Sequence, residues 1–270
     1  MTLWFIVMKT AHLSDLHFGR HICEVRLKSL GLDLTAQKPD LLIITGDVTD
    51  RGHRSQYRRA KHFLDSLSTE YISVPGNREV PASAFWEWML PPLAMTRYSS
   101  FFGPADRVVY ASPANRTVFF GLNSVHPFPA WPGRIRRDTR YWLKEQIAAY
   151  DGYFKGLFLH HPVLPVIRGS SFWAHSLSDA GEILNICSQL GVFIILQGHK
   201  HRSAIMSVSF PERGTGVVVS AVGAPLMPYG DPAYHIITID PSVLTVEARE
   251  YQDGSFRERT SCRFPIDGPG

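Results

Sequence analysis

Continuous apolar runs alternate with segments of helical spacing from residue 11 to about residue 200. Residues 41–44 and 193–196 are apolar throughout, as expected of strands that are buried on both faces. Further strands are predicted at residues 11–16 (extended backwards by 6–8), 71–74, 118–122 and 156–159. Helices are predicted between them, at residues 25–37, 56–67, 140–149 and 179–190.

The pattern changes after residue 203, where predicted strands follow one another without helices between them. Residues 217–222, 235–239 and 244–251 are predicted to form an antiparallel meander. Strands that alternate with helices and then run consecutively predict a layered α/β (α+β) fold with central sheets.

The chain is long and apolar enough for one sizeable core, with 270 residues, 44% of them hydrophobic and 12% aromatic. It contains neither an internal repeat nor a low-complexity linker, so a single domain over residues 1–270 is predicted. An aromatic-rich stretch at residues 81–104 could form a cap that stacks a base or holds an acyl chain. Core packing or a dimer interface would explain this stretch equally well, and the oligomeric state stays open.

Charge and cysteine content set only coarse limits. The formal charge of +4 suits an anionic substrate, but ordinary solubility explains it as well. Three scattered cysteines form neither a disulfide framework nor a CxxC metal site, which predicts a reduced, cytoplasmic setting. Residues 3–7 are too few to span a bilayer and lack the features of a signal peptide, and Met8 is an alternative start to Met1.

Four arginines form a basic cluster at residues 134–140. The cluster could contact a nucleotide, a nucleic acid or an anionic lipid surface, which keeps peripheral membrane contact open. A solvated face is the commoner meaning of such a run. A nuclease would need a long basic groove, and this cluster is the only sequence feature that supports one. A phosphorylated small molecule, nucleotide or nucleotide-lipid is therefore the preferred partner.

Five short polar segments follow predicted strands in order along the chain. They are Ser14-Asp15-Leu16-His17, Gly46-Asp47, Gly76-Asn77, His160-His161-Pro162 and Gly198-His199-Lys200-His201. Since ligands bind beyond the carboxyl ends of strands in open α/β sheets, we expect the segments to converge on one site. Each motif alone is commonly incidental, but together they supply the carboxylate, imidazole and amide groups that two adjacent metal ions need.

The local spacing favours metal binding at three of these segments. Asp15 and His17 are two apart, so on an extended strand end their side chains would share a face, and His199 and His201 repeat this spacing. Asp47 follows a buried strand, where an ionised carboxylate is costly unless it meets cations. A carboxylate has two oxygens and could bridge two metal ions.

The sequence resembles the calcineurin-like metallophosphoesterases from residue 11 to about residue 251. The resemblance rests on HLSDLHFG, GDVTDRG, PGNREVP, LFLHHPVLP and GHKHR, and on the glycine-led stretch 133–143. The pattern is most similar to class III cyclic-nucleotide phosphodiesterases and their bacterial relatives. It implies a four-layer α-β-β-α sandwich and a dinuclear-metal-dependent phosphoester hydrolase, in which a metal-bridging hydroxide attacks a phosphodiester or pyrophosphate.

The resemblance also implies two metal sites with Asp47 as the bridge. The first would be held by Asp15, His17, Asp47 and His201, and the second by Asp47, Asn77, His160 and His199. His160 is preferred over His161 because the ligand of the family is the histidine two residues before the proline. Oxygen and nitrogen ligands without thiolate suit Mn, Fe, Zn or Mg, among which Mn is preferred. The resemblance also implies catalytic roles for Asp47 and Arg78.

Arg78 departs from the family pattern, which has a histidine after Gly-Asn. Arginine cannot donate a proton at working pH, although it can bind phosphate through two parallel hydrogen bonds. Good leaving groups need a proton donor least, so Arg78 favours a pyrophosphate or an activated diester. The UDP-2,3-diacylglucosamine hydrolases, which cleave a pyrophosphate, resemble this chain in reading Gly-Asn-Arg. A catalytically silent phosphate-binding protein, with Arg78 paired to Asp50 or Glu79, is the alternative of another class.

Four residues are expected to contact substrate: Asn77, Arg78, Arg51 and His161. For Arg51, a turn residue paired with Asp50 is an equal alternative. The missing proton donor could be replaced by His21, His126, His161 or His175. Asn123-Ser124 ends an apolar run and could reach the site, although an ordinary strand-end turn would explain it as well.

Overall fold

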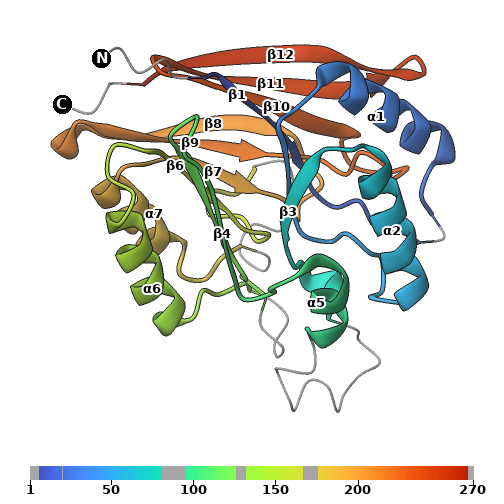
Figure 1. The fold of residues 1–270 in the computed structure, drawn as a ribbon, viewed down its shortest axis with the longest axis horizontal. Helices are drawn as coiled ribbons and strands as arrows, with labels where there is room; N and C mark the ends of the chain where they lie inside the picture. The colour runs from blue at the N-terminus through green and yellow to red at the C-terminus, as the bar shows by residue number, and fades with distance from the viewer. Residues whose placement is uncertain (1–5, 20, 81–94, 126–131, 167–175, 267–270) are drawn as a thin grey trace.

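The computed structural model describes residues 6–19, 21–80, 95–125, 132–166 and 176–266. These residues form two six-stranded mixed sheets that pack face to face, with helices on the outer side of each (Figure 1). The predicted α/β (α+β) four-layer α-β-β-α sandwich is thereby confirmed.

The first sheet contains the N-terminal strands and the C-terminal meander. Its order is β12-β11-β10-β1-β2-β3, with β1, β2 and β3 parallel and β10 antiparallel to β1. The strands are β1 (Met8–Leu13), β2 (Leu41–Thr45), β3 (Glu70–Val74), β10 (Ala233–Asp240), β11 (Val243–Gln252) and β12 (Ser255–Pro265). Helices α1 (Glu24–Gln37) and α2 (Arg54–Ser66) lie on its outer side.

The second sheet has the order β4-β5-β6-β7-β9-β8, with parallel strands in the middle and antiparallel strands at both edges. The strands are β4 (Arg107–Ser112), β5 (Thr117–Leu122), β6 (Phe154–Phe158), β7 (Val192–Gln197), β8 (Ala204–Phe210) and β9 (Thr215–Ala221). Helices α6 (Arg137–Ala148) and α7 (Ala180–Leu190) cover it, and α5 (Thr96–Phe102) packs against α2. The short 3-10 helices are η1 (Asn77–Glu79) and η2 (Pro211–Arg213).

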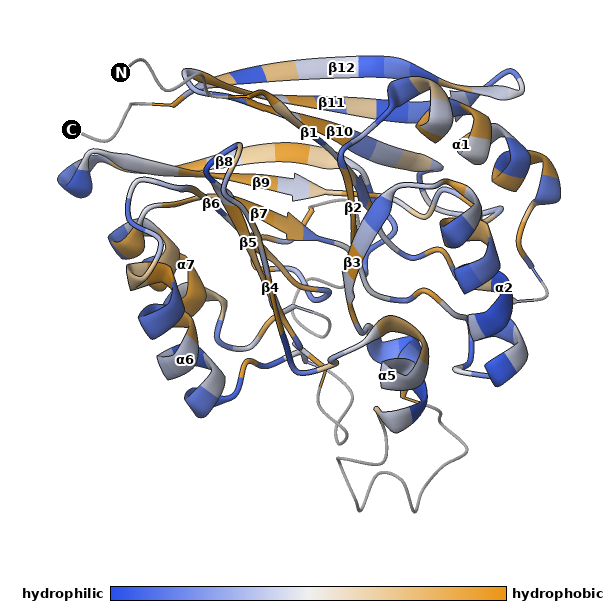
Figure 2. Ribbon diagram, viewed as in Figure 1, coloured by the Kyte–Doolittle hydropathy of each residue, from blue (hydrophilic) through white to orange (hydrophobic). Residues whose placement is uncertain are grey.

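The β2 sequence shows why the central strands are apolar on both faces. Leu41 and Ile43 belong to the core between the two sheets. There they pack with residues of the second sheet, among them Phe119, Phe158 and Ile194. Leu42 and Ile44 belong to the core under α1 and α2. Alternate residues of one strand thus face two different apolar layers, which requires an unbroken apolar run. Figure 2 shows this concentration of hydrophobic residues in the central strands.

One sequence-based prediction is wrong, and three edge strands were not predicted. The predicted meander included residues 217–222, but β9 belongs to the second sheet, where it pairs in parallel with β7 and antiparallel with β8. The strands that were not predicted are β4 and β8 in the second sheet and β12 in the first. Their residues are half-exposed or exposed, so they carry little apolar signal.

The predicted aromatic cap lies only partly within the described residues, since 81–94 fall outside them. In the described part, Phe101 and Phe102 of α5 pack against Tyr57 of α2, with ring centroids 5.2 and 6.1 Å apart. Tyr98 is fully buried in the same cluster. These aromatic side chains therefore hold α5 to α2. The prediction of a single domain stays a prediction.

Candidate metal centre

The five polar segments meet where the strand ends of both sheets come together. Backbone bonds join them in pairs: Asp15 N–H donates to the Gly46 carbonyl at 3.0 Å and His17 N–H to the Asp47 carbonyl at 2.9 Å. On the second sheet, Gly198 N–H donates to the His160 carbonyl at 3.1 Å. The convergence expected from strand polarity is therefore built by loops that hydrogen-bond to one another.

The backbone at these segments differs from the extended strand end that the spacing argument assumed. Five of the predicted ligands have positive φ: Asp15 (52°), His17 (47°), Asp47 (48°), His199 (72°) and His201 (52°). Left-handed conformations are uncommon outside glycine and are retained where the surrounding structure enforces them. Asp15 and His17 lie in a segment with left-handed residues that hydrogen-bonds to the loop after β2, so the assumed strand geometry was wrong.

The first ligand group contains one ligand atom each from Asp15, His17, Asp47 and His201, all within 4.8 Å of one another. His201 Nε2 lies 3.1 Å from Asp15 Oδ1, and His17 Nε2 lies 3.6 Å from the same oxygen. The two Nε2 atoms of His17 and His201 are 3.0 Å apart. Two imidazole nitrogens and one carboxylate oxygen thus lie close together in one small volume.

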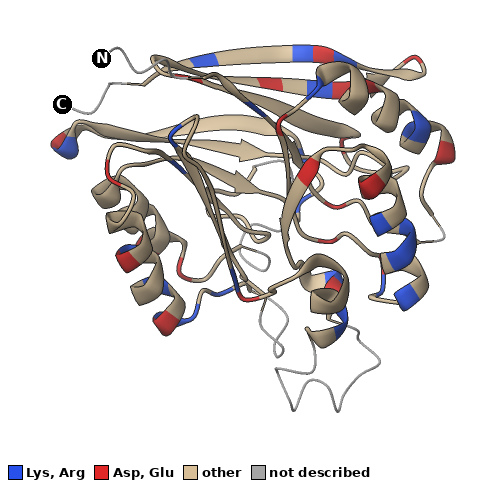
Figure 3. Ribbon diagram, in the orientation of Figure 1, with Lys and Arg blue, Asp and Glu red and all other residues tan. Residues whose placement is uncertain are grey.

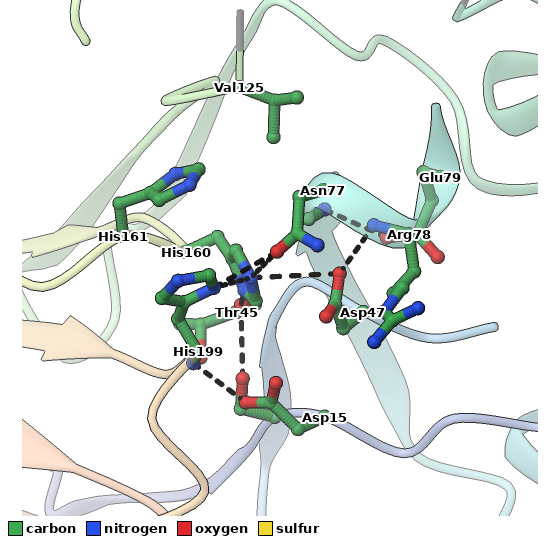
Figure 4. A network of polar contacts seen from close by, with 12 residues as sticks. Asp15, Thr45, Asp47, Asn77, Arg78, Glu79, Val125, His160, His161 and His199 are labelled. Carbon is green, nitrogen blue, oxygen red and sulfur yellow. Dashed lines mark hydrogen bonds and ion pairs between the residues drawn. The ribbon is translucent and has the colours of Figure 1, made fainter. Parts of the chain in front are cut away.

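The second ligand group lies beside it and contains Asn77, His160 and His199 (Figure 4). Asn77 Oδ1 lies 2.9 Å from His199 Nδ1 and 3.1 Å from His160 Nε2. The two ring nitrogens are 3.0 Å apart. Asp47 connects both groups, since its Oδ2 lies 3.8 Å from His17 Nε2 and its Oδ1 lies 3.6 Å from His160 Nε2. One carboxylate therefore turns an oxygen toward each group.

The first group contains a buried carboxylate oxygen without a hydrogen bond, to which a cation could bind. Asp15 Oδ1 is buried and accepts no well-directed hydrogen bond from the described residues, although His201 Nε2 is close. Converging lone pairs of two imidazoles and two carboxylates repel one another unless a proton or a metal ion lies between them. Buried oxygen and nitrogen donors without thiolate fit a divalent metal ion such as Mn²⁺, Fe²⁺ or Zn²⁺.

The pKa values of the ligands reflect burial and the charges of their neighbours. Burial opposes charge on both partners, but the Asp15 carboxylate raises the pKa of His201 above its usual range. In turn, the His201 charge helps to hold the pKa of Asp15 well below its usual range, against the effect of burial. Burial and the neighbouring His160 lower the pKa of His199. Metal ligands must be deprotonated, so metal binding would compete with protonation of His201 more than with that of His199.

Several backbone and side-chain bonds orient the ligands. His160 Nδ1 lies 2.7 Å from the Thr45 carbonyl, which accepts its proton and leaves the Nε2 lone pair for a metal ion. His199 N–H donates to Asp15 Oδ2, and Arg78 N–H donates to Asp47 Oδ1, both at 2.8 Å. A Cβ at Gly76 would lie 2.2 Å from Asp47 Oδ1, so this loop approaches the carboxylate as only glycine can.

Glu79 lies next to the metal centre, although the sequence indicated it only as a possible ion-pair partner of Arg78. It is buried and accepts hydrogen bonds from Thr49 N–H (2.9 Å), Thr49 Oγ1 (3.0 Å) and Gly76 N–H (2.8 Å). Burial and the charge of Asp47 raise the pKa of Glu79 to about 8. Glu79 therefore fastens the Gly-Asn turn to the loop after β2. Its place directly after Gly-Asn-Arg is the signal that could have identified it.

The residues predicted to contact substrate take different positions. Asn77 lies within the second group, and the exposed Arg78 is joined to Asp47 through its backbone (Figure 4). His161 is buried, with Nδ1 2.9 Å from Ser124 Oγ and its ring 4.7 Å from that of His199. Arg51 is not brought to the ligands: its side chain is 72% exposed, with Nε 3.4 Å from Asp50 Oδ2.

The remaining candidates are less closely connected to the centre. His21 is exposed, and His126 and His175 lie outside the described residues. Ser124 reaches the site through His161, as noted above. Within the basic cluster, Arg140 Nη1 lies 2.5 Å from Asp179 Oδ2, and Arg136 Nε lies 3.1 Å from Asp138 Oδ1. Figure 3 shows both acidic and basic residues on α6, which favours a solvated face.

Comparisons with known proteins agree with this geometry. The family model described as calcineurin-like phosphoesterase matches residues 8–203. A probable cyclic nucleotide phosphodiesterase of Rhodococcus erythropolis is 30% identical over 71% of this chain and 64% of its own length. A similarly named protein of Synechococcus is 29% identical over 64% of this chain and 62% of its own. The glycerophosphodiester phosphodiesterase of Enterobacter lignolyticus is 26% identical over 59% and 58%. The chain thus spans less than two thirds of these relatives.

Solved structures share the fold at low sequence identity. A dimetal phosphatase from Danio rerio has a TM-score of 0.67 at 15% identity, covering 93% of this chain and 98% of that one. A purple acid phosphatase from yellow lupin has a TM-score of 0.69 at 14% identity, covering 96% and 53%. Within the described residues, no helix is both long and apolar enough to cross a membrane. On the match over residues 8–203, the chain belongs to the calcineurin-like phosphoesterase family.

Proposed function

We propose that this protein is a dinuclear-metal-dependent phosphoester hydrolase whose preferred substrate is a phosphodiester. The observation that carries the proposal is the position of Asp47, which turns one carboxylate oxygen toward each of two ligand groups. Two such groups at one carboxylate suit a pair of divalent ions, for which we propose Mn²⁺. Ions bound there would activate a water molecule and neutralise the charge on the phosphoryl oxygens.

The chain itself supplies orientation and charge around these ions. Asn77 turns its Oδ1 to the two histidines of the second group, so its amide N–H groups are left to donate to a phosphoryl oxygen. The Arg78 guanidinium, exposed next to Asn77, can hold a second phosphoryl oxygen. Because its proton is not released at working pH, the leaving oxygen departs as an anion or takes its proton from water.

The names of the relatives and the identity of Arg78 favour different substrate classes. Relatives named as cyclic nucleotide and glycerophosphodiester phosphodiesterases support a diester. Arg78 favours a leaving group that departs without a proton, which a phosphoanhydride provides. A diester with a good leaving group is consistent with both, and pyrophosphate cleavage is the second candidate.

Hydrolysis by the manganese-loaded protein tests the proposal. We expect metal-dependent turnover of bis-p-nitrophenyl phosphate and slower turnover of p-nitrophenyl phosphate. A nucleotide-sugar pyrophosphate is the third substrate, which tests the second candidate. Asp47→Asn is the blank, and Asp65→Asn, on the exposed surface of α2, is the matched control that keeps full activity. Two bound ions without turnover of any of the three substrates would support the silent phosphate-binding protein instead.

A further inference from the structure

An exposed tyrosine lies directly beside a ligand of the first group. Tyr229 is 53% exposed, and its ring centroid is 5.8 Å from that of His201, with the ring planes inclined by 27°. Among the described residues, few large apolar side chains are this exposed, and the only other tyrosine of similar exposure is Tyr141 on α6. An exposed aromatic ring at the rim of a polar site is a common element of ligand recognition.

The loop that carries Tyr229 is anchored on one side by the segment before and within α1. Residues 222–227 are buried, whereas 228–230 form an exposed tip. Cys23 N–H donates to the Leu226 carbonyl at 2.9 Å, and the Arg26 guanidinium donates to the Met227 carbonyl. The buried half of the loop is therefore held in place by the first sheet's helical layer.

The other side of the loop is anchored to the segment that carries His201. Asp231 N–H donates to the His201 carbonyl, and the Asp231 carboxylate accepts from Ser203 N–H and from the Arg202 guanidinium, each at 2.9 Å. Gly230 has φ +79°, and a Cβ there would lie 2.8 Å from His201 Cβ. The tip thus packs on the backbone of His201, which fixes Tyr229 relative to the ligand group.

From this arrangement we propose that Tyr229 is a platform that stacks on the nucleobase of a nucleotide ester whose phosphate lies at the two ligand groups. The proposal rests on the proposed function. One part of the ring is covered by His201, and the rest is open to solvent. Because the loop is already anchored, stacking costs little further conformational entropy.

Two observations favour a nucleobase over an aliphatic ester group. Stacking requires a planar π-system, which a glycerol or ethanolamine group does not offer. The relatives named as cyclic nucleotide phosphodiesterases make a base the planar group of first choice. The family model matches residues 8–203, so Tyr229 lies outside the residues that it matches.

Equilibrium binding of two phosphate monoesters tests the platform without turnover. The probes are AMP and glycerol 3-phosphate, measured by calorimetry on the manganese-loaded protein. We expect Tyr229→Ala to raise the Kd of AMP roughly ten-fold, since stacking of a base on an aromatic side chain is worth about 1–3 kcal/mol, and to change the Kd of glycerol 3-phosphate less than about two-fold. Tyr229→Phe keeps the ring and should keep AMP affinity.

The controls separate stacking from support of His201. Tyr141→Ala removes an equally exposed tyrosine and should leave both Kd values unchanged. Manganese content, measured for every variant, should stay the same in Tyr229→Ala. If that variant loses metal or weakens both probes equally, Tyr229 supports His201 and the platform is refuted. Unchanged AMP binding also refutes it. If the wild-type protein binds neither probe, the platform is refuted, whereas turnover of bis-p-nitrophenyl phosphate decides the proposed function separately.

Discussion

The two ligand groups that share Asp47 differ in charge. The first has a carboxylate of its own, Asp15, which is fully buried. The second has the neutral, half-buried Asn77 in that place. A divalent ion is attracted more strongly by two carboxylates than by one. On charge alone, the first group would therefore hold a divalent ion more tightly than the second.

The two groups also differ in how their histidines are oriented. His160 of the second group is fixed through Nδ1 by the Thr45 carbonyl at 2.7 Å. In the first group, Nδ1 of His17 is buried without a hydrogen-bond partner among the described residues, so its ring is held by packing and by the turn that carries it. Hydrogen bonds to the second ring nitrogen strengthen a histidine ligand. His160 is therefore oriented through its second ring nitrogen, whereas His17 is not.

Removal of the shared carboxylate should have the largest effect because it breaks both groups at once. We expect Asp47→Asn to lower kcat/KM at least about a thousand-fold, since loss of the metal contribution costs several kcal/mol and each 1.4 kcal/mol is a factor of ten. Steady-state kinetics and metal content measure this effect. Activity within about ten-fold of wild type would mean that Asp47 does not connect two working sites.

Metal removal should separate the two groups. Calorimetric titration of the metal-free protein with Mn²⁺ is expected to show a tight step followed by a weaker one, because only the first group has two carboxylates. Asn77→Ala should weaken Mn²⁺ binding at the second group roughly a hundred-fold, so that the weak step disappears from the titration. Asp15→Asn should abolish the tight step instead. Two equal steps, or loss of the tight step in Asn77→Ala, would contradict the assigned difference.

The comparison also shows which parts of the site the sequence could predict. The order of the motifs and the polarity of the strands were enough to bring Asp15, Asp47, Asn77, His160 and His199 to one edge. Which ring nitrogen faces Asn77 Oδ1 was not predictable, and it differs: Nε2 in His160 but Nδ1 in His199. That choice depends on the left-handed turns, which are set by hydrogen bonds between loops far apart in sequence.

The same limit applies to the fold. Buried strands such as β2 were predictable because both faces are apolar. The edge strand β12 and the Tyr229 loop were not, since exposed residues carry no periodic apolar signal. The sheet to which β9 belongs depends on long-range pairing with β7, which local pattern does not encode.

A buried hydrogen-bonded chain beneath both groups gives a prediction about pH. His12 Nδ1 and His235 Nδ1 each lie 2.8 Å from Ser220 Oγ, and His12 Nε2 lies 3.0 Å from Thr45 Oγ1. The chain joins the two sheets and reaches the residue whose carbonyl orients His160. Burial lowers the pKa of His235 to about 3 and, with His235 nearby, lowers that of His12 as well.

The sign of the effect follows from these shifts. A histidine whose pKa is depressed by folding stabilises the protein fully above its unfolded pKa of about 6.5, and this stability is lost as pH falls toward the folded value. For His235, the loss between pH 7 and pH 5 is about 2 kcal/mol. Denaturant unfolding at constant Mn²⁺ should show a flatter pH dependence in His235→Asn by that amount. His62→Asn, on the exposed side of α2, should follow wild type, and parallel curves for His235→Asn would refute the assignment.

The smallest expected effect concerns Arg78, which lies beside the second group and the shared carboxylate. If Arg78 limits catalysis of poor leaving groups, Arg78→His should raise the ratio of activity on an alkyl diester to activity on an aryl diester by about ten-fold, a fraction of what general acids contribute. Arg51→His, an exposed arginine in the neighbouring turn, is the control that leaves the ratio unchanged. An unchanged ratio in Arg78→His would mean that Arg78 does not limit the cleavage of esters with poor leaving groups, and the preference for an activated leaving group would lose its support.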